Sequence, residues 1–151
     1  MKKSALLLAM MLAIPQISSA NSQYASSFVD EVKSAADGDG VLNASIDIEC
    51  PADSASGKII VSKASYDIDK STGVFVFKNS SETPIRMTSI VTEYPEDDFT
   101  SDSITGMGFI FKMPSGQFFV DIFKDGKSRA GINKNGQSGI KWIDCKISKP
   151  V

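Results

Sequence analysis

Histidine is absent from the 151-residue sequence, and cysteine occurs only twice. Without histidine the chain lacks the most common general base and zinc ligand, and it can form neither a Ser-His nor a Cys-His catalytic pair. Two cysteines are too few for a cysteine-based zinc or iron–sulfur site. Carboxylates are plentiful, but no pair is marked out by its position, and nothing resembles a nucleophile elbow. The sequence therefore predicts a protein that is not an enzyme and that binds no metal and no cofactor.

An excess of positive charge is also missing. The chain has 16 Lys and Arg residues against 18 Asp and Glu residues, a formal net charge of −2. This balance offers no basic surface for nucleic acid, so no nucleic-acid partner is expected. Hydrophobic residues make up 42% of the chain and charged residues 23%, which is typical of one folded globular domain.

The N-terminus has the three parts of a secretory signal peptide. Lys2 and Lys3 supply the positive start, and Ala5–Ile14 is an uncharged apolar run that is too short to span a bilayer. Small residues at Ser18 and Ala20 then occupy the two positions that a signal peptidase reads. The sequence predicts a cleaved signal peptide at residues 1–20 and a periplasmic or secreted bacterial protein without a membrane span.

Export changes how the two cysteines are interpreted. Cys50 and Cys145 lie in an oxidising compartment if the chain is exported, so a disulfide between them is expected.

Residues 21–151 are predicted to form a single β-domain that begins with a helix at 22–36. Apolar side chains recur at helical spacing in this segment, at Tyr24, Phe28, Val32 and Ala35. The sequence Asp37-Gly38-Asp39-Gly40 then ends the helix.

The remaining chain is mainly β. Alternating apolar and polar residues, separated by turn sequences, predict eight strands at about 41–50, 58–68, 73–79, 84–93, 105–113, 117–124, 127–133 and 138–147. Their mostly sequential hairpins predict an antiparallel meander that forms a small barrel or a strongly curved sheet. A two-sheet sandwich is the alternative.

Two turn dipeptides predict the register of the last strands. With Asp125-Gly126 as a two-residue turn, Phe123 pairs with Ser128; with Asn135-Gly136 as another, Ala130 pairs with Lys141. One face of the sheet then holds Met107, Phe109, Phe111, Phe119, Phe123, Ile132, Ile143 and Cys145. The other face holds Ile110, Phe118, Val120, Ile122, Ile140 and Trp142, with Lys112, Lys124 and Arg129 at its rim. Because both faces are apolar, the second is either covered by the helix or exposed for a partner.

The predicted disulfide conflicts with a strict count of eight strands. Cys50 ends the first strand and Cys145 lies near the end of the last, and in an eight-strand meander these ends point in opposite directions. The short strand at 127–133 is the first element that this conflict places in doubt.

One connection combines acidic and aromatic residues. The segment 94–104 carries Tyr94, Glu96, Asp97, Asp98, Phe99 and Asp102. Such a surface loop either keeps the protein soluble or presents negative charge and aromatic anchors to the basic cleft of a protein partner.

Two short motifs and the cysteine positions resemble those of a known family. The chain has Ser62-Lys63-Ala64-Ser65-Tyr66 and then Gly73-Val74-Phe75-Val76-Phe77-Lys78. This pattern resembles the periplasmic inhibitors of C-type lysozyme, which are small exported eight-stranded barrels with a Ser-Gly-x-x-Tyr motif before a Gly-aliphatic-aromatic-Val-Phe strand. Lys63 stands where that motif has glycine. The resemblance implies that Ser62, Tyr66 and Lys78 contact an inhibited enzyme.

The sequence thus favours a non-catalytic exported binding protein. Its expected role is to inhibit, or to give immunity against, a cell-envelope hydrolase or toxin, since such inhibition needs only a rigid scaffold and a complementary surface. The alternatives are a carrier of a small apolar ligand, because an eight-stranded barrel is just wide enough for one, and a secreted virulence or surface component.

Overall fold

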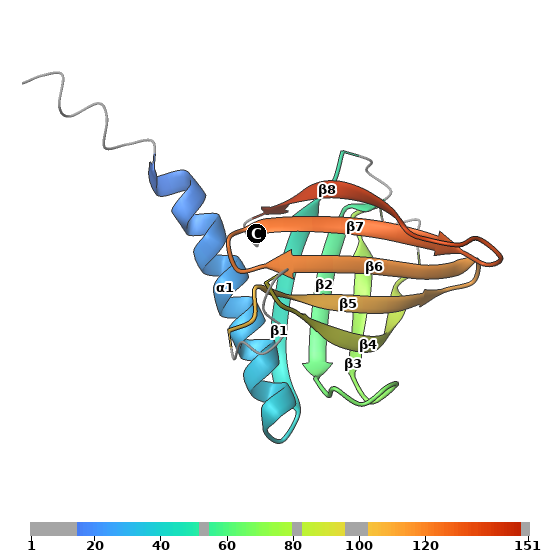
Figure 1. Ribbon diagram of the computed structural model, residues 1–151, viewed down its shortest axis with the longest axis horizontal. Helices are drawn as coiled ribbons and strands as arrows, with labels where there is room; N and C mark the ends of the chain where they lie inside the picture. Colours follow the sequence, from blue (N-terminus) through green and yellow to red (C-terminus); the bar gives the residue numbers. More distant parts are fainter. Residues whose placement is uncertain (1–14, 52–54, 80–82, 96–102, 149–151) are drawn as a thin grey trace, which may run out of the picture.

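The structure, a computed structural model, describes residues 15–51, 55–79, 83–95 and 103–148, and for residues 15–20 it describes the backbone alone. One helix and eight antiparallel strands are present, and the strands close into a barrel (Figure 1). The elements are α1 (Pro15–Asp37), β1 (Val41–Glu49), β2 (Gly57–Lys63), β3 (Thr72–Phe77), β4 (Ile85–Glu93), β5 (Gly106–Met113), β6 (Gly116–Phe123), β7 (Lys127–Lys134) and β8 (Lys141–Ser148). The predicted β-meander is confirmed as a closed barrel, and the sandwich alternative is wrong.

Closure of the barrel resolves the conflict between the disulfide and the strand count. The strand predicted at 127–133, which this conflict placed in doubt, is present as β7 and pairs with both β6 and β8. The seam is an antiparallel pairing of β1 with β8, in which Glu49 lies opposite Lys146. Because the two strands are staggered, the next position along the seam places Cys50 opposite Cys145. The doubt was wrong because it placed Cys145 at the far end of the last strand. Cys145 is the fifth residue of β8, and the stagger between the antiparallel β1 and β8 of the closed barrel brings it beside the end of β1.

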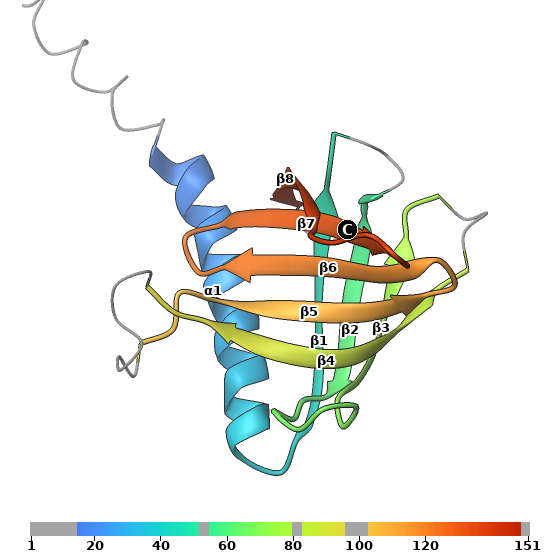
Figure 2. The ribbon, with the colours of Figure 1, turned by 45° about the vertical axis from the view of Figure 1, so that its right-hand side comes forward.

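Helix α1 packs along β1 and across the ends of β5 and β6 (Figure 2). It ends where the sequence predicted, and the Gly38 and Gly40 amides both donate to the Ala35 carbonyl, at 3.1 and 2.9 Å. Its buried face consists of Ala25, Phe28, Val29, Val32 and Ala35. The predicted apolar face of the helix is therefore confirmed at Phe28, Val32 and Ala35. It is wrong at Tyr24, which is exposed. Alanine at position 25 fits against the barrel, and the larger tyrosine lies one residue off that face.

The helix also bears on the predicted signal peptide. It begins at Pro15 and includes the predicted cleavage point after Ala20, so cleavage there would leave residues 21–37 of the helix in the mature protein. The ring of Phe28, which follows that point, lies 5.5 Å from the ring of Phe109 inside the barrel. In the described part of the chain, no helix is long and apolar enough to cross a membrane.

Phenylalanine rings pack the middle of the barrel. The Phe75 ring centroid lies 4.9 Å from those of Phe77 and Phe118 and 5.6 Å from that of Phe111, and these pairs meet edge to face. Edge-to-face pairs of this kind stabilise a core by about 0.5–1.5 kcal/mol each beyond burial of their area. The space between the strands is thus filled largely by side chains of the protein itself.

The predicted register between β6 and β7 is wrong by one residue. Ile122, not Phe123, pairs with Ser128. The connection has three residues because Gly126, at a φ of +95°, donates its amide to the Phe123 carbonyl at 3.0 Å. Glycine adopts this left-handed conformation readily, so the Asp-Gly signal predicted the right turn with the wrong length. A one-residue slip moves every side chain of a strand to the other face.

This slip overturns the two predicted apolar faces. Phe118, Val120 and Ile122 point into the barrel and are buried, whereas Phe119 and Phe123 are only partly buried. The β7–β8 register is also wrong, since Ala130 pairs with Ile143 instead of Lys141, but a shift of two residues keeps each side chain on its face. The predicted second face is therefore wrong for Phe118, Val120 and Ile122, which lie in the core, whereas Ile110, Ile140 and Trp142 remain partly exposed.

Candidate partner-binding site

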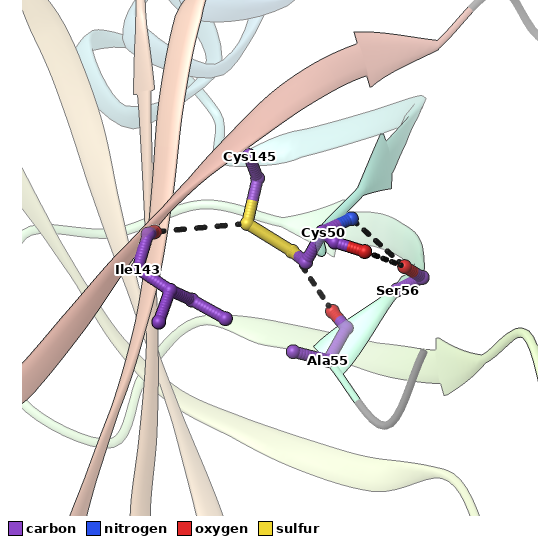
Figure 3. Close-up of a disulfide and its surroundings, with 5 residues drawn as sticks. All are labelled: Cys50, Ala55, Ser56, Ile143 and Cys145. Atoms are coloured by element: carbon purple, nitrogen blue, oxygen red, sulfur yellow. Dashed lines mark hydrogen bonds between the residues drawn. A yellow bond between two sulfur atoms is a disulfide. The ribbon is translucent and has the colours of Figure 1, made fainter. Parts of the chain in front are cut away.

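The predicted disulfide between Cys50 and Cys145 is confirmed (Figure 3). The two Cα atoms lie 4.3 Å apart across the β1–β8 seam, although 95 positions separate them in the sequence. The Cys50 amide donates to the Ser56 hydroxyl at 2.8 Å, and that hydroxyl donates to the Cys50 carbonyl at 3.3 Å. The bridge and these hydrogen bonds hold the start of β2 and the seam together. A disulfide fits an exported protein, because cytosolic thiols are kept reduced.

The residues implied by the family resemblance do not come together. Lys78 lies beside Ser56, to whose carbonyl its amide donates at 2.9 Å, at the start of β2. Ser62 lies near the other end of β2, about 20 Å away at the usual rise of a strand. There its hydroxyl donates to the Thr72 carbonyl at 3.1 Å. The Lys78 ammonium lies 3.7 Å from the Glu49 carboxylate on the exposed surface. Ser62 and Lys78 therefore do not form one compact site.

Tyr66 instead contacts the end of the helix. It follows β2, it is 44% exposed, and its hydroxyl lies near enough to the Asp37 carboxylate to help lower the pKa of Asp37. Asp37 also accepts from the Lys33 ammonium at 2.7 Å. The hydrogen bond between these two groups lowers the pKa of Asp37 and raises that of Lys33. Partial burial, followed by the neighbouring Asp37 charge, raises the pKa of Tyr66, so its hydroxyl stays protonated and can donate.

Tyr94 joins this group from the end of β4. It is 40% exposed, and repulsion between the ionised forms of the two phenols adds a smaller upward contribution to the pKa of Tyr66 after burial and Asp37. We call Lys33, Asp37, Tyr66 and Tyr94 the helix-end cluster. It brings together one tyrosine from the predicted acidic segment and one from the family resemblance. The other residues of that segment, Glu96, Asp97, Asp98, Phe99 and Asp102, lie outside the described residues.

Exposed aliphatic side chains flank the helix-end cluster. Ile68, two residues after Tyr66, is 80% exposed, and Val41, which pairs with Lys63 at the end of β2, is 70% exposed. Large apolar side chains that gather on a polar surface are a mark of an interaction site. The sequence did not single out these two residues, because neither belongs to a motif and exposure depends on the fold.

A second group of charged residues lies on the outside of the barrel and was missed by the sequence analysis. The Arg129 Nε atom lies 2.6 Å from the Asp121 Oδ2 atom, and the Asp121 side chain is almost fully buried. The Arg129 guanidinium lies over the Trp142 ring, 4.1 Å from its centroid. We call Glu93, Asp121, Arg129 and Trp142 the cross-strand cluster. Arg129 was predicted at the rim of the face that holds Trp142, but neither Asp121 nor Glu93 was assigned to it, although Asp121 is an acidic residue within the apolar run Phe118–Phe123.

Glu93 is held next to Asp121 across β5. Burial and then the charge of Asp121, which also hydrogen-bonds to it, raise the pKa of Glu93 from 4.5 to about 7. Gly108 allows this approach, since a Cβ atom there would lie 2.8 Å from the Asp121 Oδ1 atom and 2.7 Å from the Val91 side chain. Near neutral pH the Glu93 carboxyl can thus donate a proton to Asp121 in a hydrogen bond.

The two clusters differ in how many of their side chains remain exposed for contact with a partner. In the cross-strand cluster, Asp121, Arg129 and Trp142 satisfy one another, which indicates a role in stability. In the helix-end cluster, two tyrosines remain exposed beside a charged pair. Tyrosine is enriched in protein interfaces because it combines a large apolar ring with a hydroxyl. The helix-end cluster is therefore the stronger candidate for a binding site.

The described residues contain no group of three or more His, Cys, Asp or Glu side chains that could hold a metal ion. Comparisons of the chain with protein-family models, curated proteins and solved structures found no match.

Proposed function

We propose that this chain is an exported, non-catalytic bacterial protein that inhibits, or gives immunity against, a cell-envelope hydrolase or toxin. The observation that carries the proposal is the exposure of Tyr66 and Tyr94, which both contribute to the raised pKa of Lys33 beside Asp37. The two tyrosines come from different connections of the barrel and share one exposed region. Exposed aromatic anchors are typical of the energetic centre of a protein interface.

The scaffold suits a protein that acts by binding. A closed barrel, a packed aromatic core and a disulfide across its seam limit the motion of the surface loops. A rigid binding surface loses little conformational entropy on association, and more of the contact energy is then available as affinity.

Charge favours a basic partner. Without Lys2 and Lys3, the predicted mature chain has 14 basic and 18 acidic residues, a net charge of −4. Five of the acids lie between Glu93 and Asp102, in and beside the segment that follows Tyr94. A basic hydrolase or toxin is therefore the class of partner that this protein would attract from a distance.

Site-specific photocrosslinking tests this proposal. A photoreactive phenylalanine analogue replaces each of the three tyrosines of the chain in turn, in the bacterium that exports the protein. Tyr24 is the matched control, because it is exposed to 39% on the other half of α1. We expect the variants at Tyr66 and Tyr94 to form an adduct with the same protein and the variant at Tyr24 to form none.

The captured protein then serves in an activity assay. The purified chain should inhibit its hydrolytic or toxic activity, and Tyr66→Ala should weaken that inhibition more than Tyr24→Ala. C-type lysozyme on peptidoglycan is assayed in parallel, since the family resemblance names it as a target. Equal crosslinking at all three positions, or a captured protein whose activity is unaffected, would contradict the proposal.

A further inference from the structure

A cavity opens at the end of the barrel that lies away from α1. It lies between Ala55, which precedes β2, and the ends of β6, β7 and β8, and it has a volume of about 350 Å³. In Figures 1 and 2 the β7–β8 hairpin points away from the helix, so this cavity and the helix-end cluster lie on different parts of the molecule. The apolar lining consists of Ala55, Phe118, Ala130, Ile132 and Ile143.

The floor and walls of the cavity are preformed. Phe118 is buried and its ring packs against that of Phe75, which joins the floor to the aromatic core. The disulfide braces two walls, because the Cys50 sulfur lies 3.4 Å from the Ala55 carbonyl oxygen and the Cys145 sulfur 3.7 Å from that of Ile143 (Figure 3). The cavity therefore does not depend on a partner to form it.

The rim of the cavity is apolar and positively charged. Ile132 follows Ala130 on the inward-facing side of β7 and still leaves 40% of its surface exposed. Lys134 and Lys141 lie beside it, and within the described residues neither lysine takes part in an ion pair and no carboxylate lines the cavity. Two unneutralised ammonium groups above an apolar hollow attract an anion that carries an apolar chain.

We propose that this cavity binds a small anionic amphiphile, with its apolar chain against Phe118 and Ile143 and its acidic head group between Lys134 and Lys141. The volume lies at the lower end of the range for small-molecule sites, which fits a single medium-length chain. The binding site is the mouth of the barrel, because phenylalanine rings occupy its middle.

Calorimetric titration of the oxidised full-length protein with decanoate tests the proposal. Decanol and decyltrimethylammonium serve as neutral and cationic probes of the same chain length. We expect decanoate to bind most tightly and the cation most weakly. The amide NMR signals of residues 130–143 should shift on addition of decanoate, while those of residues 22–36 stay in place. No binding of decanoate, equal binding of the cation, or shifts confined to the helix would each overturn the proposal.

Two double variants separate the head-group contact from net charge. Lys134→Gln with Lys141→Gln should weaken decanoate binding about tenfold, the loss expected for two exposed ion pairs. Lys112→Gln with Lys146→Gln removes the same charge from exposed positions outside the cavity and should leave the affinity unchanged. Ile132→Trp, at a half-exposed site where a larger ring can be accommodated, should block decanol and decanoate alike. Equal affinities of the two double variants for decanoate would show that Lys134 and Lys141 do not contact the head group.

Discussion

Arg129 of β7 and Asp121 of β6 lie directly opposite each other, and the Arg129 Nε atom is 2.6 Å from the Asp121 Oδ2 atom. The carboxylate is almost fully buried, whereas the guanidinium is partly exposed and covers the Trp142 ring. Arginine suits this position because its planar group can bond a carboxylate at its edge and stack on an aromatic ring with its face. A single residue thus joins strands β6, β7 and β8.

Arg129→Gln should lower the free energy of unfolding by about 2–3 kcal/mol, because it leaves a buried carboxylate without its charged partner. It should also make Trp142 more accessible to acrylamide. Trp142 is the only tryptophan, so urea unfolding and quenching can both be followed by its fluorescence. Lys124→Gln, which removes an exposed pair with Asp30, is the control and should cost less than about 1 kcal/mol. Equal losses of unfolding free energy for the two variants would show that the buried Asp121–Arg129 pair contributes no more to stability than an exposed ion pair.

Glu93 should make the stability of the protein depend on pH. Its pKa is about 7 in the folded protein and near 4.5 when unperturbed, so the folded state holds the proton more tightly. The free energy of unfolding should therefore fall as the pH rises from about 5 to 7.5, as this proton is lost from the folded state. The chain has no histidine, whose titration would otherwise overlap this window.

Glu93→Gln tests this pH dependence by urea unfolding at pH 5 and pH 8. The variant should be more stable than the wild type at pH 8, where Glu93 and Asp121 would otherwise both be charged. It should differ little at pH 5. Glu31→Gln removes one exposed acid from α1 and should leave the wild-type pH dependence intact. A Glu93→Gln profile parallel to the wild-type profile would assign the effect to another group.

The disulfide should be formed in the exported protein and should contribute much of its stability. Replacing Cys50 and Cys145 together by alanine should lower the free energy of unfolding by about 2–5 kcal/mol, because the bridge closes a loop of 95 positions. Alkylation without reductant, followed by mass spectrometry, should find no free thiol. Two alkylated cysteines in periplasmic material would contradict the first part of this prediction.

The acidic segment should speed association with the proposed basic partner. Replacing Glu96, Asp97, Asp98 and Asp102 by the corresponding amides should lower the association rate at low salt, and the difference should shrink at high salt. Stopped-flow or surface-binding kinetics with the crosslinked partner would measure it. Folding should be unaffected. An unchanged association rate would leave the segment with a role in solubility alone.

The mature protein should begin at Asn21. Signal peptidase reads the small residues Ser18 and Ala20. Cleavage after Ala20 would keep the described side-chain contacts of α1 intact, because they all come from residues after this point. The intact mass of the exported protein and its N-terminal sequence measure the cleavage site. An exported protein that still contains residues 1–20 would show that the apolar segment is not a signal peptide.

Local patterns in the sequence determined much of the fold. Alternation with a period of two and the Gly-containing turns predicted all eight strands, and the Asp-Gly run predicted the end of α1. The two cysteines and the export signal predicted the bridge that Cys50 and Cys145 form. These features depend on neighbouring residues, or on the redox environment of the whole chain, so they could be deduced without coordinates.

Only the tertiary structure decided which residues meet across the barrel. Asp125-Gly126 was the right turn, yet its third residue, Lys124, shifted the register and moved Phe118 and Val120 from the predicted outer face into the core. The same shift placed Asp121 opposite Arg129. Tyr66 and Tyr94 both influence the pKa of Lys33 at the end of α1, and no local pattern encodes that placement. A side-chain period of two makes each such contact depend on the exact length of every turn, and turn length is set by backbone geometry that a dipeptide does not specify.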